Sequence, residues 1–426
     1  MSRDDAKLDD WIDAHFDEEV AFLQALVRVP TDTPPGDNAP HADVTATLLE
    51  GFGFAVDRHP VPKARVDAHG LASITNLVVR RRYGSGPTIA LNAHGDVVPP
   101  GEGWSHDPYG GEVDGGKLYG RASAVSKSDF ATYTFALRAL DALAADLARE
   151  SPGATLAGSV ELHFTYDEEF GGELGPGWLL ETGRVKPDLL IAAGFSYQVV
   201  TAHNGCLQLE VTVHGKMAHA AIPATGVDAL QGAVEILNAL YAQNDLYRQV
   251  TSRVAGITHP YLNVGTIAGG TNTNVVPGKV VFKLDRRMIP EEDPTEVEAT
   301  LRRVIGDAVA RRAGLTVEIR RLLLARALKP LSGNQALVAA LQKHGEAVFG
   351  ETIPVSGTPL YTDVRLYGEA GIPAAIYGAG PRTVLESNAK RADEHLDLED
   401  LRGATKVVAR TLRELLAPRR ESPHAQ

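Results

Sequence analysis

Acidic and histidine side chains gather directly after three apolar runs that are predicted to be strands. They are His94 to Asp96 after residues 88–92, Asp167 to Glu169 after residues 159–165, and the segment 388–395 after residues 372–378. Ligands of α/β proteins bind at the carboxyl ends of such strands. The spacing therefore predicts that the three clusters share one edge of a sheet.

Each cluster contains residue types that can do chemistry. A histidine two residues before an aspartate, as in His94 and Asp96, can place one ring nitrogen on a divalent metal while the aspartate fixes the other. Glu168 and Glu169 are costly to bury together without a cation, and their like charges raise one pKa, as a proton shuttle requires. Alone, either pair also fits a solvated loop.

The surrounding pattern indicates the elements that position these clusters. Apolar residues at helical spacing predict helices near 20–27 and 44–52, and a longer helix after Asp129. Strands are predicted at 76–82, 88–92, 159–165 and 188–193. Alternating strands and helices predict an α/β sheet flanked by helices.

The pattern of predicted strands and helices changes near residue 205. Alternating strands and two amphipathic helices then follow in the order strand-helix-strand-strand-helix-strand, which is a self-contained α+β unit. The α/β texture resumes after residue 323. We therefore predict a discontinuous main domain, 1–205 and 324–426, with an inserted domain at 206–323.

Composition excludes several classes of protein. The 426 residues are 44% hydrophobic and 23% charged, and 42 basic against 54 acidic residues give a net charge of −12. No basic stripe is available for nucleic acid, and no apolar run approaches the length of a membrane span. Cys206 is the single cysteine, so no internal disulfide forms. A soluble, cytoplasmic protein that acts on a small molecule is expected.

A set of motifs resembles one known family along nearly the whole chain. In order they are HGDVVP, GWSHDPYGGEVDGGKLYGRAS, YDEEFGG, GKMAHAAIP, GGTNTNVVPG, DRR, YTDVR and YGAGP. This order and spacing is similar to that of the M20 metallopeptidases, which include deacylases, aminoacylases and carboxypeptidases. The resemblance implies a zinc-hydrolase-like domain with a mainly parallel sheet and an inserted, ferredoxin-like dimerisation or lid domain.

The resemblance also implies a role for each matching residue. His94 matches a metal ligand, Asp96 the acid that orients it, Glu168 the general base and Glu169 a ligand of the second metal. In the inserted domain, His219 matches the histidine that stabilises the oxyanion. Asn274 and Arg287 match residues that grip the substrate, and an arginine fork suits a carboxylate. Arg287 can equally be a strand arginine that pairs with Asp285.

Three positions depart from the family pattern. Valine stands at position 125, where the family has the aspartate that bridges both metals. Gly194 occupies the position where the family has an acidic metal ligand, and Lys390 occupies the position where it has a metal-binding histidine. Without the bridging carboxylate, two metal ions are not held close together as a two-metal site requires.

We therefore expect at most one weakly bound divalent ion, manganese or zinc. His94 and Glu169 would hold it, with Asp96 or Asp129 as a further ligand. Lys390 would supply a fixed charge that stabilises substrate, or would only neutralise Glu169.

The leading hypothesis is a metal-dependent hydrolase of a C–N bond in a small carboxylate-bearing substrate. Resemblance to M20-related 5-nitroanthranilate aminohydrolases suggests deamination of 5-nitroanthranilate to 5-nitrosalicylate with release of ammonia. The alternative is an N-acyl amino acid deacylase or dipeptidase whose ligands come from other positions, such as His203 or His395. A third hypothesis is a non-catalytic binding protein with a decayed metal site. The inserted domain indicates at least a dimer.

Overall fold

The computed structural model describes residues 2–151 and 155–417, which divide into two compact units. The first unit comprises residues 1–201, 331–355 and 366–426, and the second comprises 202–330 and 356–365. The sequence placed the insertion at 206–323. No helix in the described part of the chain combines the length and the apolar character that a membrane span requires.

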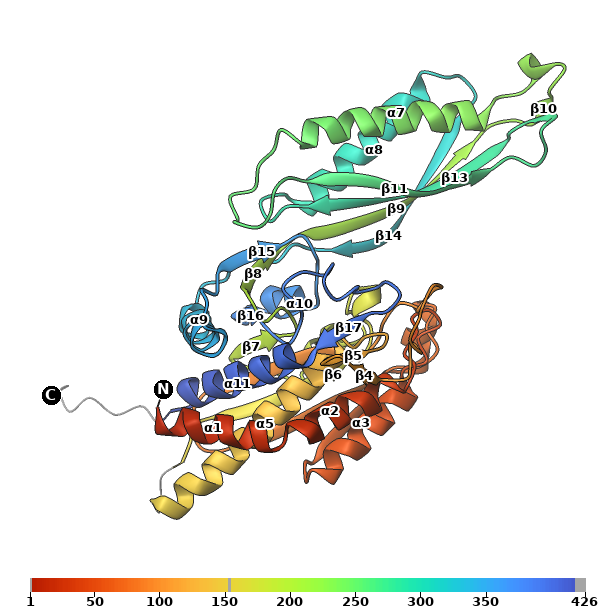
Figure 1. The fold of residues 1–426 in the computed structure, drawn as a ribbon. Helices are drawn as coiled ribbons and strands as arrows, with labels where there is room; N and C mark the ends of the chain where they lie inside the picture. Colours follow the sequence, from red (N-terminus) through yellow and green to blue (C-terminus); the bar gives the residue numbers. More distant parts are fainter. Residues whose placement is uncertain (1, 152–154, 418–426) are drawn as a thin grey trace. The chain divides into compact units, whose positions relative to one another are not determined.

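An eight-stranded sheet forms the centre of the first unit, although residues 202–203 of its seventh strand and 356–358 of its eighth are counted with the second unit (Figure 1). Its strands, in spatial order, are β1 (Val56–Pro60), β2 (Thr75–Arg82), β6 (Ser159–Thr165), β3 (Thr88–His94), β7 (Leu189–Ala192), β16 (Ala374–Ile376), β8 (Val199–His203) and β15 (Val355–Thr358). Strands β6, β3, β7 and β16 are parallel to one another. Strands β3 and β6 are buried on both faces, as parallel strands are. β3 has an apolar run from Ile89 to Leu91, whereas β6 alternates apolar residues with the buried pair Glu161 and His163.

Helices cover this sheet and close its core. The long helix α5 packs on β3 and β6, and α1, α2 and α11 pack against α5. The helices of this unit are α1 (Arg3–Ala14), α2 (Phe16–Val27), α3 (Ala39–Gly51), α4 (Lys63–Ala68), α5 (Lys127–Glu150), α6 (Pro176–Glu181), α9 (Gln335–Phe349), α10 (Val364–Glu369) and α11 (Leu398–Leu415). A small sheet of β17 (His395–Asp397), β5 (Lys117–Tyr119) and β4 (Glu112–Asp114) joins distant parts of the chain.

The second unit has its own sheet and core. Its antiparallel strands are β11 (Tyr261–Gly269), β13 (Lys279–Met288), β9 (Gly205–His214) and β14 (Thr316–Ala325), in that order. Helices α7 (Ala229–Tyr247) and α8 (Pro294–Ala310) cover one face (Figure 1). Alternate residues of β9, from Leu207 to Val213, are buried beneath them. A two-stranded ladder of β10 (Ala218–His219) and β12 (Val275–Val276) completes the unit.

The predicted fold class, an α/β domain with a mainly parallel sheet and an additional α+β unit, is confirmed. Most predicted elements are present within a few residues: β6 covers 159–165 and β3 begins at Thr88, as predicted. Strand β3 runs on to His94, so this side chain is held by the sheet itself and not by a loop.

Candidate active site

Four parallel strands place the predicted clusters at one edge of the sheet. His94 ends β3, and Glu168 and Glu169 lie in the single 3₁₀ turn that follows β6. Gly194 follows β7, and the segment that carries Lys390 follows β16. Because parallel strands present their carboxyl ends on the same side, residues from four separate stretches meet there.

Asp96 ties His94 to the acidic turn. The His94 Nδ1 lies 3.0 Å from the Asp96 carbonyl oxygen and 3.4 Å from its Oδ1. The Asp96 carboxylate also accepts the backbone N–H groups of Glu168 at 3.2 Å and Glu169 at 3.0 Å. These contacts direct the other ring nitrogen of His94, Nε2, toward Glu168, whose Oε2 is 3.8 Å away.

Burial and neighbouring charges together set the protonation of this pair. Desolvation raises the pKa of Glu168 to about 7, although the neighbouring His94 opposes the shift. Burial would lower the pKa of His94, but the carboxylates of Glu168, Asp96 and Glu169 outweigh it and raise the pKa to about 10. A carboxyl group whose pKa is near neutrality can both take and return a proton.

Glu169 has a different partner. Its Oε2 accepts a hydrogen bond from the Lys390 ammonium at 2.7 Å, while its Oε1 is buried with no hydrogen-bond partner among the described residues. The Glu169 side chain is 8% exposed and that of Lys390 is 48% exposed. Lys390 thus links the buried Glu169 carboxylate to the surface.

Asp129 is engaged by the backbone. It lies buried in the first turn of α5, where its Oδ1 accepts the Ala379 N–H at 2.8 Å. Burial raises its pKa to about 7. A Cβ at Gly378 would lie 1.9 Å from the same oxygen, so glycine is required there. The carboxylate fastens α5 to the segment after β16.

The second unit holds the other predicted residues. His219 and Asn274 lie together, because β10 pairs with β12 and the Asn274 carbonyl accepts the Ala220 N–H at 2.9 Å. The His219 Nδ1 accepts the Ala221 N–H at 3.0 Å, which leaves Nε2 to carry the ring proton. Both residues are exposed in this unit.

Arg287 lies elsewhere in this unit, on β13. Its Nε donates to the Asp285 Oδ1 at 2.7 Å, and its guanidinium lies over the Tyr361 ring at 5.5 Å. The predicted ion pair with Asp285 is therefore present. It uses Nε and leaves the two Nη groups for a carboxylate.

The alternative ligand histidines have other partners. The His203 ring nitrogens lie 2.8 Å from the Asn204 carbonyl oxygen and 3.4 Å from the Thr362 N–H. His395 lies in β17, where its Nε2 is 3.3 Å from the Lys117 Nζ. A role for either ring as a metal ligand stays a prediction.

A buried ion pair beneath the site was not predicted from the sequence. Glu394 accepts from the Arg121 Nη1 at 2.6 Å, and each side chain is 1% exposed. Arg121 lies in the motif that ends GRAS, and Glu394 lies in the cluster 388–395. Spacing alone could not show that the two charges are buried against each other, because 273 residues separate them.

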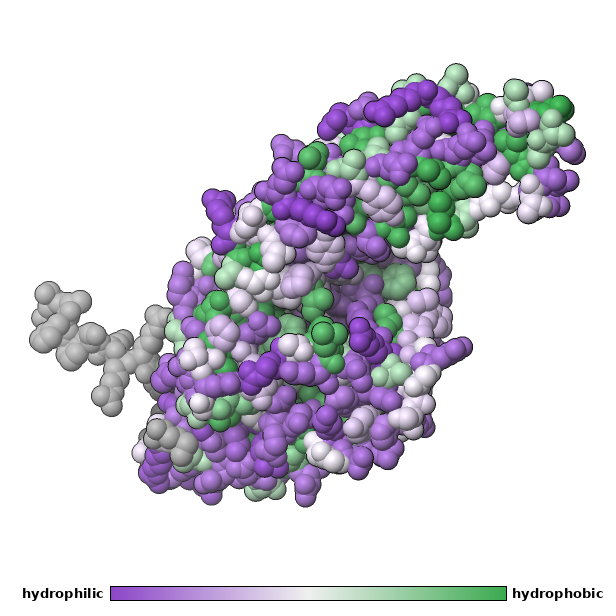
Figure 2. Space-filling view, turned by 45° about the horizontal axis from the view of Figure 1, so that its top comes forward, coloured by the Kyte–Doolittle hydropathy of each residue, from purple (hydrophilic) through white to green (hydrophobic). Residues whose placement is uncertain are grey.

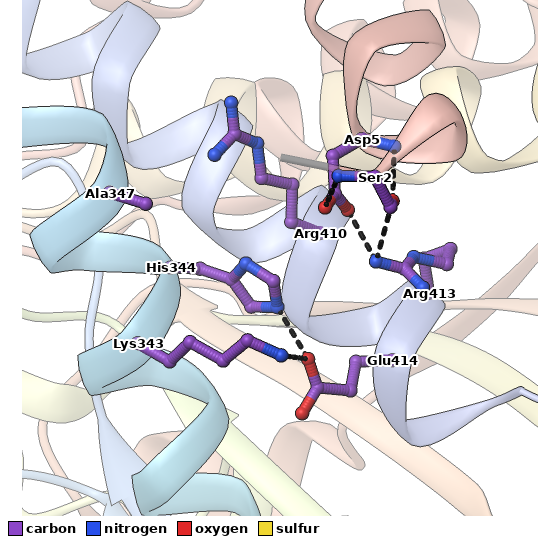
Figure 3. Close-up of a pocket in the computed structure, with 8 residues that line it drawn as sticks. All are labelled: Ser2, Asp5, Lys343, His344, Ala347, Arg410, Arg413 and Glu414. Atoms are coloured by element: carbon purple, nitrogen blue, oxygen red, sulfur yellow. Dashed lines mark hydrogen bonds and ion pairs between the residues drawn. The ribbon is translucent and has the colours of Figure 1, made fainter.

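A separate pocket lies between α1, α9 and α11 (Figure 3). Its charged groups neutralise one another: Asp5 pairs with Arg413, and Lys343 and His344 pair with Glu414. It contains none of the predicted site residues.

Comparisons with known proteins point to one family. The sequence pattern of "Peptidase family M20/M25/M40" matches residues 90–414. A succinyl-diaminopimelate desuccinylase of Gluconobacter oxydans (strain 621H) is 30% identical over 308 residues, which is 70% of this chain and 73% of that protein.

Two solved structures have the same fold. The M20 family metallo-carboxypeptidase Sso-CP2 from Sulfolobus solfataricus superposes with a TM-score of 0.76 at 18% identity, over 93% of this chain and 99% of that chain. The Bacillus subtilis YXEP protein, described as a dinuclear metal binding peptidase, has a TM-score of 0.63 at 17% identity, over 95% and 99% of the two chains.

The residues at this edge do not fit a dinuclear metal centre. Residues 2–151 and 155–417 contain no group of three or more His, Cys, Asp or Glu side chains that could hold a metal ion. The side chain of Val125 is a hydrocarbon and cannot bind a metal. An acidic side chain does not fit at Gly194 without a shift, because its Cβ would lie 2.3 Å from the Ile376 Cγ2. Lys390 brings a positive charge to the remaining acid, Glu169.

Proposed function

The chain belongs to peptidase family M20/M25/M40, and on that premise we propose that it hydrolyses the amide C–N bond of a small N-acyl substrate that carries a carboxylate. The observation that carries the proposal is the buried Glu168 beside His94, both fixed by Asp96 at the carboxyl ends of β3 and β6. M20 enzymes are metal-dependent hydrolases of amide and peptide bonds.

Glu168 is the general base of the proposed reaction. It takes a proton from a water molecule, whose oxygen attacks the amide carbon, and it returns that proton to the leaving nitrogen as the C–N bond breaks. A pKa of about 7 suits both transfers. Asp96 holds the Glu168 backbone in place, which keeps the base beside the position of the attacking water.

Residues of the second unit are assigned to the substrate. His219 has its Nε2 proton available for the oxyanion, because its Nδ1 already accepts a hydrogen bond. Asn274 lies beside it. Arg287 is assigned to the substrate carboxylate through the Nη atoms that Asp285 leaves open.

An N-acyl substrate is favoured over an aromatic amine. The relative of 30% identity is a succinyl-diaminopimelate desuccinylase, and its name supports a deacylase. Deamination of 5-nitroanthranilate stays a prediction without such support. The manganese or zinc ion that the sequence predicts on His94 and Glu169 has no part in these steps, because the Lys390 ammonium already binds Glu169. Side chains of this chain carry every step above.

The proposed assembly is a homodimer. Large apolar side chains are exposed on the outer face of α7 and on the edge strand β11, and Figure 2 shows apolar side chains at the surface of this unit. They are Leu230, Val234 and Tyr241 on α7 and Ile267 on β11, each 45–48% exposed. An edge strand beside an apolar helix face is suited to a second copy of the chain.

A substrate panel tests the proposal. N-succinyl and N-acetyl amino acids, a dipeptide and 5-nitroanthranilate are incubated with chelator-treated protein, with and without added manganese or zinc. We expect turnover of an N-acyl amino acid and none by the Glu168→Gln variant. Turnover of 5-nitroanthranilate alone would select the ring aminohydrolase. Binding without turnover of any substrate would select the non-catalytic alternative.

A further inference from the structure

Lys390 is held in place by a buried network and not by its own side chain alone. Its backbone N–H donates to the Glu394 Oε2 at 3.2 Å, and its φ of +62° is unusual for a residue other than glycine. Glu394 is itself fixed by the buried Arg121. The ammonium therefore sits on a rigid support when it meets Glu169.

The same Glu394 carboxylate also holds the position beside Val125. Its Oε1 accepts the Ala124 N–H at 3.2 Å, while its Oε2 accepts the Lys390 N–H. One buried carboxylate thus joins two backbone segments, one before Val125 and one at Lys390. At both of these positions the resemblance expects a metal ligand, and this chain has a valine and a lysine instead.

The charge of the site requires a cation. Asp96, Glu168 and Glu169 are three carboxylates at one edge, and buried carboxylates are costly without compensating positive charge. The His94 imidazole faces Glu168, so Glu169 depends on a second cation. The Lys390 ammonium lies 2.7 Å from Glu169, the acid that the resemblance implies as a metal ligand. The ammonium occupies the approach to Oε2, and its charge also disfavours a second cation at Oε1, which is buried without a hydrogen-bond partner in the described chain.

We propose that the Lys390 ammonium has replaced one of the two metal ions of the M20 site, so that Glu169 is neutralised by a side chain of the protein and binds no metal. This inference rests on the proposed function, because the ammonium then provides the positive charge that faces the reacting amide. Lys390 is a positioning residue for Glu169 and an electrostatic group of the site.

Metal stoichiometry of designed variants tests the proposal. Val125→Asp restores the missing carboxylate while Lys390 stays, and Val125→Asp/Lys390→His restores both missing ligands next to Glu169. Each full-length protein is equilibrated with zinc, passed through a desalting column and analysed by mass spectrometry for bound metal. Circular dichroism confirms that each variant is folded.

We expect the wild type and Val125→Asp to retain little zinc, and the double variant to retain about one ion per chain with at least about tenfold higher affinity. The matched control is Val125→Asp/Lys406→His, which places the new histidine on α11, where Lys406 pairs with Asp13. It should stay as poor in zinc as Val125→Asp.

Two results would overturn the proposal. One is a full equivalent of zinc in Val125→Asp with Lys390 still present, and the other is a folded double variant that gains no zinc. These measurements need no substrate. If no substrate in the panel is turned over, the proposed function fails while the replacement of the metal by Lys390 is still decided.

Discussion

Glu168 and Glu169 are neighbours in sequence but face different cations. Glu168 lies 3.8 Å from the His94 imidazole, and Glu169 is bound to the Lys390 ammonium at 2.7 Å. Glu169 is thus already bound to a positive charge of the protein, whereas Glu168 has a pKa of about 7. Glu168 is left as the group that exchanges a proton.

Replacement of Glu168 by glutamine should abolish turnover and preserve binding. The amide has the same shape but cannot take a proton, so kcat falls roughly 10²–10⁴-fold. The dissociation constant of the substrate, measured by calorimetry, should change little. Glu173→Gln, an exposed acid in the same loop, is the control and should keep normal turnover. A near-normal rate for Glu168→Gln would show that another residue is the base.

Sequence spacing was enough to predict that His94, Asp96, Glu168 and Glu169 share a site. Each follows a strand that is readable from its apolar run, and parallel strands bring such ends together. The hydrogen-bond and ion-pair partners of these residues were harder to predict. Lys390 was assigned by resemblance, and its contact with Glu169 spans 221 residues, which no local pattern encodes. The hydrogen bond between Asp129 and Ala379 was invisible for the same reason.

At the scale of elements, α2 and α11 meet through a buried acid. The Thr405 hydroxyl of α11 donates to the Glu19 Oε1 of α2 at 2.6 Å, and the Glu19 Oε2 is buried with no hydrogen-bond partner in the described chain. Desolvation raises the pKa of Glu19 from 4.5 to about 8. The folded state therefore binds this proton more tightly than the unfolded state does.

The variant Glu19→Gln should flatten the pH dependence of stability. Because the pKa is raised on folding, the contribution of Glu19 is fully present below pH 4.5 and is lost as the pH rises through about 8. The free energy of unfolding of the variant should gain on the wild type by up to about 1.4 kcal/mol per pH unit in that window. Urea denaturation at several pH values measures the difference.

The neighbouring Glu18 provides the control for this measurement. It lies on the same helix, but its side chain is 44% exposed where it meets Arg138. Stability of Glu18→Gln should run parallel to that of the wild type across the pH range. If Glu19→Gln also runs parallel to the wild type, the pKa of Glu19 is the same in the folded and unfolded states, and the expected shift is absent.

Elements with a regular apolar pattern were predicted, and short irregular ones were not. The strands β6 and β3 and the helix α5 each bury a long run or stripe of apolar side chains. The three-residue strands β4, β5 and β17 have no such period, and β17 pairs with β5 across more than half of the chain. Their existence depends on pairing, which the sequence does not show.

At the scale of the whole molecule, family membership confirms the predicted class of enzyme, a hydrolase of C–N bonds. The exact boundaries of the inserted domain and its role as a lid stay predictions. Each unit has a hydrophobic core of its own, the first around the long helix α5 and the second beneath α7 and α8.

An acidic residue on the outer face of α7 should break the proposed dimer. Val234 is 47% exposed and lies one helical turn from the exposed Leu230. Val234→Asp would place an unpaired charge at an apolar interface, so light scattering should give the mass of a single chain. Leu385→Asp, at another exposed apolar residue, is the control and should leave the mass at two chains. A wild type that is already monomeric would contradict the proposal.

The contacts between α1 and α11 have a consequence for how the protein is made. The Arg410 Nε of α11 donates to the Asp9 Oδ1 of α1 at 2.9 Å, and α11 also packs on α5. On the ribosome, α1 and α5 emerge long before α11, so their apolar faces that pack on α11 stay uncovered until almost the entire chain has been made. Residues 202–330 emerge in one stretch and can fold while the others wait. The nascent chain would therefore carry an uncovered apolar layer for most of its synthesis, which makes it a natural client of chaperones.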